Sequence, residues 1–429
     1  MEMKEVWLID YARTAFSRSR PRQPERDVFG EIRGDELLAT LLMEFFESPK
    51  YLGNKSVEKK DIEEFTVGSA MGVYEAWTYG GRIPLFLADF PVHVPGLFVD
   101  RQCGSAGSGM HVGIMEIMTG NSKICLAGGV EHMTRIPMQN DHVNANLNIV
   151  NKKSKWYRPQ YDLMNAINMI QTAQKLYEQE VPNFTKEDLD KFGVRAHNLT
   201  VKNTEDGWFK GEIIPVEGHV EGNVEESMIV DRDMAARKST LEGVAELPRL
   251  SRPFYLEKNG GKEGYMQREG TDKGVITPGN SSPLNAGATT CLLMEAEEAK
   301  KRGLEPMARI VSIGWAGVDP SVMGRGPVPA TQKALDFAGL EADDIEYWEI
   351  NEAFTIVTLN CMKAFNIPED KVNIMGGSTA IGHPLGSTMI RLPGTLARIL
   401  KDKKAKYGVA NACCGGGQGV ATILENLDA

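Results

Sequence analysis

Four residues stand in glycine-rich or small-residue stretches that suit covalent thiol chemistry. They are Cys103 in DRQCGSAGSG, Asn351 in NEAF, His383 in GGSTAIGHPLG and Cys413 in CCGGGQG. A cysteine provides a soft nucleophile, and a histidine can take up its proton and return it. Each residue alone also fits a structural role, as a buried thiol, a core histidine or a turn asparagine. The chemistry therefore requires a fold that brings the four together.

Cys103 lies in a stretch that predicts a strand, an abrupt turn and a helix. Leu97 to Val99 form the apolar strand, and Met110, Ile114, Met115 and Met118 recur at helical spacing behind the cysteine. Cys103 is thus expected at a helix N-terminus, where the positive end of the helix dipole can lower a thiol pKa. The neighbouring glycines at 104, 107 and 109 indicate that another group approaches the backbone closely.

The composition is that of a globular protein with two or three domains. The chain has 429 residues, 42% hydrophobic residues, 25% charged residues and a formal net charge of −10. This charge disfavours nucleic acid or an anionic membrane as the main partner. Six cysteines follow neither a disulfide framework nor the CxxC spacing of zinc sites, which indicates a reducing compartment. We expect a cytoplasmic protein without a membrane span.

Strands and helices alternate in the first part of the chain. The pattern predicts a strand at 6–9, a loop at 10–20, a helix at 36–46, a strand at 65–68, a helical piece within 80–90 and a buried strand at 122–129. The stretch from 131 to 281 is rich in asparagine, methionine and charge, and we interpret it as an inserted loop domain. Its basic residues fit either a phosphate contact or a solvated surface: Lys152, Lys153, Lys155, Arg158, Arg237 and Lys238.

The last part of the chain repeats the order of the first. It predicts strands at 308–317 and 347–350, helices at 331–339, 354–365 and 387–401, and a hairpin closed by the glycines after Cys414. A glycine-rich turn opens a helix in both parts, with Cys103 in the first and His383 in the second. A duplicated α/β unit would bring these two turns together. The predicted domains are 1–130 plus 282–304, 131–281 and 305–429.

Taken together, these motifs resemble the thiolase family over nearly the whole chain. Further matching stretches are Arg13-Thr14, GGVEHMTRIPM at 128–138, TPGNSSPLNAGA at 277–288 and GVDPSVMGRGPVPA at 317–330. The resemblance implies the thiolase fold, in which two duplicated α/β halves form an αβαβα layering with an inserted loop domain.

The resemblance also implies roles for individual residues. Cys103 matches the acylated nucleophile, His383 its base, and Cys413 the second cysteine, which moves a proton to or from CoA or acetyl-CoA. Asn351 matches the asparagine that holds an oxyanion-hole water, and the N–H groups of Cys103 and Gly415 would line a second oxyanion hole. Ser282 and Arg237 match CoA-binding residues, and Met169 and Met323 match methionines of the acyl pocket.

The implied activity is a ping-pong acyl transfer through a Cys103 thioester. It cleaves a 3-ketoacyl-CoA with CoA or runs in the reverse, condensing direction, with CoA as substrate and without a metal or redox cofactor. The implied assembly is a homodimer or homotetramer. Two alternatives remain: a thiolase-like scaffold subunit of a β-oxidation complex, and a decarboxylating ketoacyl synthase, which would need a second histidine. A further alternative is a metal- or redox-binding site at the adjacent Cys413 and Cys414.

Three departures from the family pattern leave the acyl specificity open. Residues 387–391 read Ser-Thr-Met-Ile-Arg, where the family has small residues and a glycine before the arginine. Ile170 and Gln174 replace a glycine and a glutamate. The glycine-rich segment within 253–274 is longer than the common pattern and suits either a CoA entrance or an oligomer contact.

Overall fold

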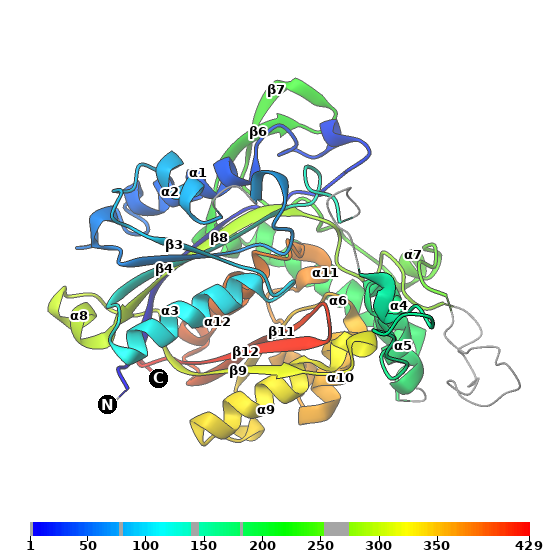
Figure 1. The fold of residues 1–429 in the computed structure, drawn as a ribbon. Coiled ribbons are helices and arrows are strands. Elements are labelled where there is room, and N and C mark those ends of the chain that lie inside the picture. Colours follow the sequence, from blue (N-terminus) through cyan, green and yellow to red (C-terminus); the bar gives the residue numbers. More distant parts are fainter. Residues whose placement is uncertain (1–2, 77–79, 139–145, 181–182, 253–273) are drawn as a thin grey trace, which may run out of the picture.

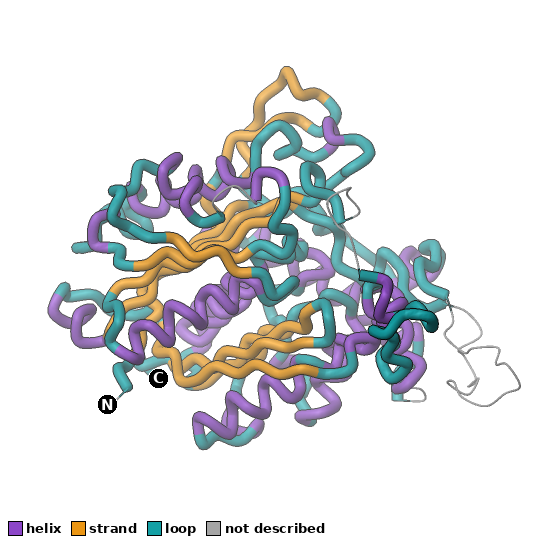
Figure 2. Tube along the Cα trace, viewed as in Figure 1, coloured by secondary structure: helices purple, strands orange, loops and turns teal. Residues whose placement is uncertain are grey.

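The computed structural model describes residues 3–76, 80–138, 146–180, 183–252 and 274–429. Strands and helices alternate along most of this length (Figure 2). The strands are β1 (Val6–Thr14), β2 (Glu64–Gly68), β3 (Gly96–Val99), β4 (Ile124–His132), β5 (Ile213–Ile214), β6 (Val216–Val220), β7 (Asn223–Val230), β8 (Ala286–Glu295), β9 (Ala308–Gly317), β10 (Tyr347–Ile350), β11 (Tyr407–Cys414) and β12 (Gln418–Glu425). The helices are α1 (Gly34–Glu47), α2 (Arg82–Leu87), α3 (Ser105–Thr119), α4 (Leu163–Ala166), α5 (Met169–Glu180), α6 (Lys186–Glu205), α7 (Leu241–Ala245), α8 (Ala296–Lys301), α9 (Pro327–Ala338), α10 (Thr355–Phe365), α11 (Ser378–Ile381) and α12 (Thr388–Lys403).

The large sheet consists of two halves that meet at a short join. Its order is β10-β11-β12-β9-β1-β8-β4-β2-β3, with β5 added beside β1. β1 and β9 pair only at Trp7 with Arg309 and at Leu8 with Ala308. Because so few pairs join them, the halves can turn away from each other and enclose helices between them (Figure 1).

Five layers result from this arrangement. Helices α3 and α12 lie between the two half-sheets, α1 and α2 cover the outer face of one, and α9 and α10 cover the outer face of the other (Figure 1). α3 packs on β2 and β4, whereas α12 packs on β10 and β11 and also contacts α3. The predicted αβαβα layering is therefore confirmed, and the two chain ends lie side by side at one edge of the molecule.

The strand pairing demonstrates the predicted duplication. β2 pairs parallel with β4, and the following pairs β4-β8 and β8-β1 are antiparallel. β10 likewise pairs parallel with β11, and β11-β12 and β12-β9 are antiparallel. α3 precedes β4 as α12 precedes β11, so the turns that open these two helices occupy equivalent places. Gly129 lets them approach, because a Cβ there would lie 2.2 Å from the carbonyl oxygen of Gly386.

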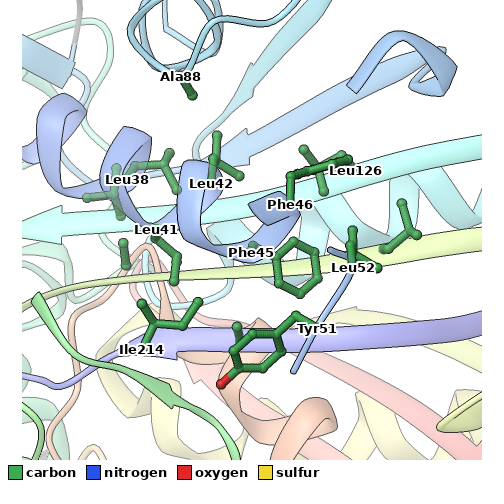
Figure 3. Packing of buried hydrophobic residues seen from close by; sticks show 14 of the residues in the cluster. Leu38, Leu41, Leu42, Phe45, Phe46, Tyr51, Leu52, Ala88, Leu126 and Ile214 are labelled. Carbon is green, nitrogen blue, oxygen red and sulfur yellow. The ribbon is translucent and has the colours of Figure 1, made fainter. Parts of the chain in front are cut away.

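The outer face of the first half-sheet shows why α1 forms where the periodicity predicts it. Leu38, Leu42 and Phe45 recur at helical spacing and are fully buried against the sheet. Figure 3 shows this apolar face beside Leu126 of β4 and above Ile214 of β5. The β6-β7 hairpin projects from the same side of the molecule, above β8 (Figure 1).

β1 is longer than the sequence predicts, because charged residues continue it into the core. The expected loop from Asp10 to Arg20 begins only after Thr14. The Arg13 guanidinium is fully buried and binds Glu212 at 2.7 Å and Asp233 at 2.7 and 2.9 Å. A buried charge is tolerated when it is paired and hydrogen-bonded, and no local pattern reveals partners some 200 residues away.

The bulky residues at the start of α12 have a structural explanation. Met389 and Ile390 are buried in the layer between the half-sheets. Met389 occupies the space beside Gly107 of α3, where an added Cβ would lie 2.7 Å from the Met389 Cβ. Gly107 and Met389 are therefore a complementary pair at the contact between α3 and α12.

We predict that Gly107→Ala lowers the stability of the fold, although alanine favours a helix over glycine by about 1 kcal/mol. The clash with Met389 should outweigh this gain, since overpacking a core typically costs about 1–3 kcal/mol. Thermal unfolding of Gly107→Ala, Met389→Gly, which removes the clashing Cβ, and the double variant measures the coupling. The double variant should lose less stability than the summed losses of the two single variants. Simple additivity would refute the contact.

Candidate active site

Cys103 lies directly before α3, in a turn that packs against the equivalent turn of the second half. Gly104 is the N-cap of α3, so the predicted position at a helix N-terminus is confirmed. Cys103 is 5% exposed and packs with Ala70, Met133 and Leu385, the last from the GHPLG stretch. Gln102, immediately before it, has a φ of 50°. A non-glycine residue in this left-handed region is strained and persists only where the surroundings fix it.

The expectation of a lowered pKa for Cys103 is wrong. Burial raises the pKa of this thiol to about 12. The N–H groups of Gly415 and of Cys103 itself point at the sulfur and oppose the shift, but the carboxylates of Glu131 and Asp100 add to it. Desolvation thus outweighs the helix terminus, and Cys103 rests as a protonated thiol.

His383 is held as a neutral imidazole whose Nε2 carries the lone pair. Its Nδ1 lies 2.6 Å from the Thr388 hydroxyl, which itself donates to the Pro384 carbonyl at 2.9 Å. Because that hydroxyl proton is already used, Nδ1 must carry the proton that joins the two side chains. Burial, and then the nearby Arg391, lower the pKa of His383 to about 3. The imidazole is therefore unprotonated at Nε2 at neutral pH.

Asn351 contacts His383 directly. Its amide Nδ2 lies 3.2 Å from His383 Nε2, and its Oδ1 accepts a hydrogen bond from Ser378 at 2.7 Å. The Ser378 hydroxyl accepts from Arg391 at 2.9 Å, and Arg391 pairs with the buried Glu349 at 2.7 Å. This chain of donors fixes the amide so that its N–H points at His383.

Two further side chains hold the backbone of the His383 turn. The Asn285 Oδ1 accepts the N–H of His383 at 2.8 Å. Glu131 accepts the N–H groups of Ala70 and Gly386, both at 2.9 Å, and so ties this turn to the wall beside Cys103. Burial raises the pKa of Glu131 to about 7, whereas these hydrogen bonds favour the carboxylate.

Cys413 and Cys414 end β11 on opposite faces of the sheet. Cys413 is fully buried with the cluster that contains Met323, and burial followed by the proximity of Cys103 raises the pKa of its thiol. Cys414 packs between the half-sheets near the N–H of Gly104. The hairpin thus places Cys413 and the Gly415 N–H beside Cys103.

The described residues contain no cluster of three or more His, Cys, Asp or Glu that could hold a metal ion.

The residues that the sequence predicts to contact CoA or the acyl group lie in different parts of the structure. Met169 and Met323 belong to the same apolar cluster as Cys413. The Ser282 hydroxyl donates to the carbonyl of Ala353, within NEAF, at 3.2 Å. Arg237 is exposed and lies near Arg18 and His197.

The two substitutions on α5 have different surroundings. Ile170 is half-buried against the Met323 cluster. Gln174 is fully buried, accepts from Ser251 at 2.7 Å and from the Val275 N–H at 2.8 Å, and donates to Glu178 at 2.8 Å. An amide donates and accepts at the same time without a change of protonation, which accounts for Gln174. The segment singled out at 253–273 lies outside the described residues.

The sequence pattern predicts no role for five residues that hold the site: Thr388, Ser378, Arg391, Asn285 and Glu131. All five stand in or near the motifs that resemble the thiolase family, so their location in the sequence was the available signal. Their function depends on which side chain each one contacts, and those contacts cross up to 255 positions of the chain.

We predict that alkylation of Cys103 by iodoacetamide accelerates with pH without levelling off between pH 7 and 9. The thiolate is the reactive form, and a pKa raised to about 12 keeps it a minor species over this range. Stopped-time alkylation followed by peptide mass spectrometry measures the rate. A plateau with a midpoint below pH 8 would show an ion pair of thiolate and imidazolium instead.

A second prediction concerns Thr388. Thr388→Val removes the acceptor for the His383 Nδ1–H, so Nε2 is no longer held as the base, and Cys103 alkylation at pH 8 should slow by about tenfold or more. Thr388→Ser restores a hydroxyl and should recover most of the rate. Equal rates in both variants, with unchanged thermal unfolding, would rule out this role for the hydroxyl.

Family models and known proteins agree on one relationship. The thiolase N-terminal domain model matches residues 6–260 and the thiolase C-terminal domain model matches residues 304–426. The chain is 36% identical to a 3-ketoacyl-CoA thiolase of Marinobacter nauticus over 99% of both chains, and 35% identical to one of Vibrio vulnificus over 99% and 100%.

Solved structures extend the likeness to the fold. The acetyl-CoA acetyltransferase of Bacillus anthracis superposes with a TM-score of 0.80 at 28% identity, over 99% of this chain and 100% of that one. Human mitochondrial 3-ketoacyl-CoA thiolase gives a TM-score of 0.80 at 26% identity, over 99% of each chain. With both family models and full-length relatives in agreement, this chain belongs to the thiolase family.

Proposed function

We propose that the protein is an acetyl-CoA C-acyltransferase that cleaves 3-ketoacyl-CoA with CoA, and that also catalyses the reverse condensation. One observation carries the proposal. His383 is fixed by Thr388 and Asn351 as a neutral base, in a turn packed against that of the protonated thiol Cys103. The names of the full-length relatives support the substrate class.

The first half-reaction transfers the acyl group to the enzyme. His383 Nε2 takes the thiol proton, and the Cys103 sulfur attacks the C3 carbonyl of the substrate. The C2–C3 bond then breaks, its electron pair passes to the acetyl-CoA enolate, and Cys413 gives this carbon a proton. Acetyl-CoA leaves, and the enzyme retains an acyl thioester, a Cys413 thiolate and a protonated His383.

The second half-reaction restores the enzyme. The Cys413 thiolate takes the proton of the incoming CoA thiol, and the CoA sulfur attacks the Cys103 thioester. Acyl-CoA forms as the Cys103 sulfur leaves and regains its proton from His383. Both steps are reversible, so the same groups serve condensation. No metal or redox cofactor is required for this proton and acyl balance.

Preorganised donors stabilise the oxyanions of these steps. We assign one hole to a water held by Asn351 and His383, and the second to the N–H groups of Cys103 and Gly415. Removing one such donor typically costs about 3 kcal/mol of transition-state stabilisation. Ser282 and Arg237 are proposed to contact CoA, and Met169 and Met323 to line the acyl pocket beside Cys413.

The scaffold alternative is disfavoured, because a subunit that only bound acyl-CoA would not need a base fixed in one tautomer beside a buried thiol.

We propose a cytoplasmic homodimer or homotetramer. Among the described strands, β3 pairs with β2 alone, and its Leu97 is 41% exposed, which supports an assembly through this sheet edge. Sedimentation equilibrium measures the number of subunits. Within the described residues, no helix is long and apolar enough to cross a membrane.

We predict that Cys103→Ala abolishes the CoA-dependent loss of 3-ketoacyl absorbance and the acyl-enzyme, with the fold intact. Cys413→Ala should still form the acyl-enzyme from acyl-CoA but lose at least about 100-fold in turnover, because proton transfer at the α-carbon and at CoA is lost. Intact-protein mass spectrometry detects the acyl group. Acetoacetyl-CoA and a long-chain 3-ketoacyl-CoA, assayed in parallel, report the chain-length preference.

The matched control is Cys414→Ala, which removes a buried thiol next to Cys413 without entering the proposed mechanism. Its turnover should stay within a few-fold of the unmodified enzyme. A labelled acetyl group on intact Cys103→Ala, or full turnover by Cys413→Ala, would overturn the assignment of these residues.

A further inference from the structure

The segment from 146 to 167 forms a compact loop on the surface of the inserted region. Its chain turns back on itself, since the Arg158 N–H donates to the Ile149 carbonyl at 3.0 Å. At its base, Asp162 accepts from Lys175 at 2.9 Å, and Lys175 also contacts Ser321 at 2.6 Å. The loop is thus closed on itself and anchored to the body of the protein. We call it the basic-aromatic loop.

Its charge is opposite to that of the whole protein. The loop carries Lys152, Lys153, Lys155 and Arg158, all exposed, and Asp162 as its one acidic residue. That carboxylate is engaged by Lys175. Within the described part of the chain, none of the four cations forms a salt bridge, and Arg158 donates only to backbone carbonyls of the loop. The loop therefore presents an uncompensated positive charge on a protein of net charge −10.

Large apolar side chains are exposed among these cations. Trp156 is 55% exposed and Ile167 60%, and Leu147, Tyr161 and Met164 are similarly exposed. The Lys155 ammonium lies 5.1 Å from the centre of the Trp156 ring. Exposed apolar groups at this density mark an interaction surface rather than a solvated one.

We propose that the basic-aromatic loop docks on the surface of an anionic phospholipid bilayer. Lysine and arginine beside tryptophan, tyrosine and aliphatic side chains match such a surface, because the cations meet the headgroups while the apolar groups enter the interface. The net charge of −10 does not prevent docking, since charges beyond a Debye length of about 10 Å are screened.

The position of the loop gives this docking a consequence for the acyl substrate. Its last part is α4, which packs against α5 and against the turn Pro320–Arg325. These two elements carry Met169 and Met323, the methionines assigned to the acyl pocket. Attachment through the loop would hold that side of the protein toward the bilayer, where long-chain acyl thioesters partition. The docking itself does not depend on the acyl-transfer assignment.

Vesicle flotation of the full-length protein tests the proposal. The protein should float with vesicles of phosphatidylcholine mixed with phosphatidylglycerol, and not with phosphatidylcholine alone. Reversal of all four loop cations to glutamate should lower the bound fraction at least about tenfold. Raising the salt from about 0.1 to about 1 M should release the unmodified protein, because the Debye length falls to about 3 Å. Trp156→Ala should weaken binding at low salt.

The control variant reverses four exposed lysines elsewhere to glutamate: Lys60, Lys191, Lys301 and Lys333. It has the same net charge as the loop variant but should keep vesicle binding. Turnover of a short-chain substrate without vesicles should be the same in all variants, which separates docking from catalysis. Absence of flotation, or equal binding to neutral vesicles, would overturn the proposal. A change of oligomeric state in the loop variant would also overturn it, by identifying the loop as a contact between subunits.

Discussion

The whole active site depends on the close packing of α3 against α12 between the two half-sheets. These helices begin directly after the Cys103 turn and the His383 turn, so the separation of the nucleophile and its base is set by how closely the helices approach. Small residues make that approach possible: Gly129 admits the Gly386 turn, and Gly107 admits Met389. A core packed at this density does not deform continuously, so it holds the two turns in one arrangement.

Burial governs the electrostatics of the site. It raises the pKa of Cys103 and lowers that of His383, so that both groups rest in their neutral forms. Charge therefore appears only during the reaction, when the proton moves from sulfur to nitrogen. Fixed hydrogen bonds then determine the direction of that transfer. Thr388 orients the imidazole, and the Arg391 to Ser378 to Asn351 chain orients the amide. Preorganisation of this kind replaces the reorganisation that water would otherwise require.

The duplicated architecture explains why such different residues occupy equivalent places. Each half supplies a parallel pair of strands, a helix between them and a turn at the start of that helix. One copy carries the thiol and the other the imidazole, and the last hairpin adds Cys413 beside them. The region between the two halves contributes Met169, which we assign to the acyl pocket, and the basic-aromatic loop. The four proposed catalytic residues thus belong to the duplicated core.

The sequence alone determined the elements and the chemistry-bearing residues. Periodicity placed α1, β9 and β10, and the resemblance of the motifs identified Cys103, Asn351, His383 and Cys413, because spacing and local residue types are written along the chain. Tertiary structure alone decided the length of β1, whose Arg13 needs distant carboxylates, and the protonation of Cys103. It also decided the role of Thr388. These properties depend on burial and on contacts between remote segments, which a local pattern does not record.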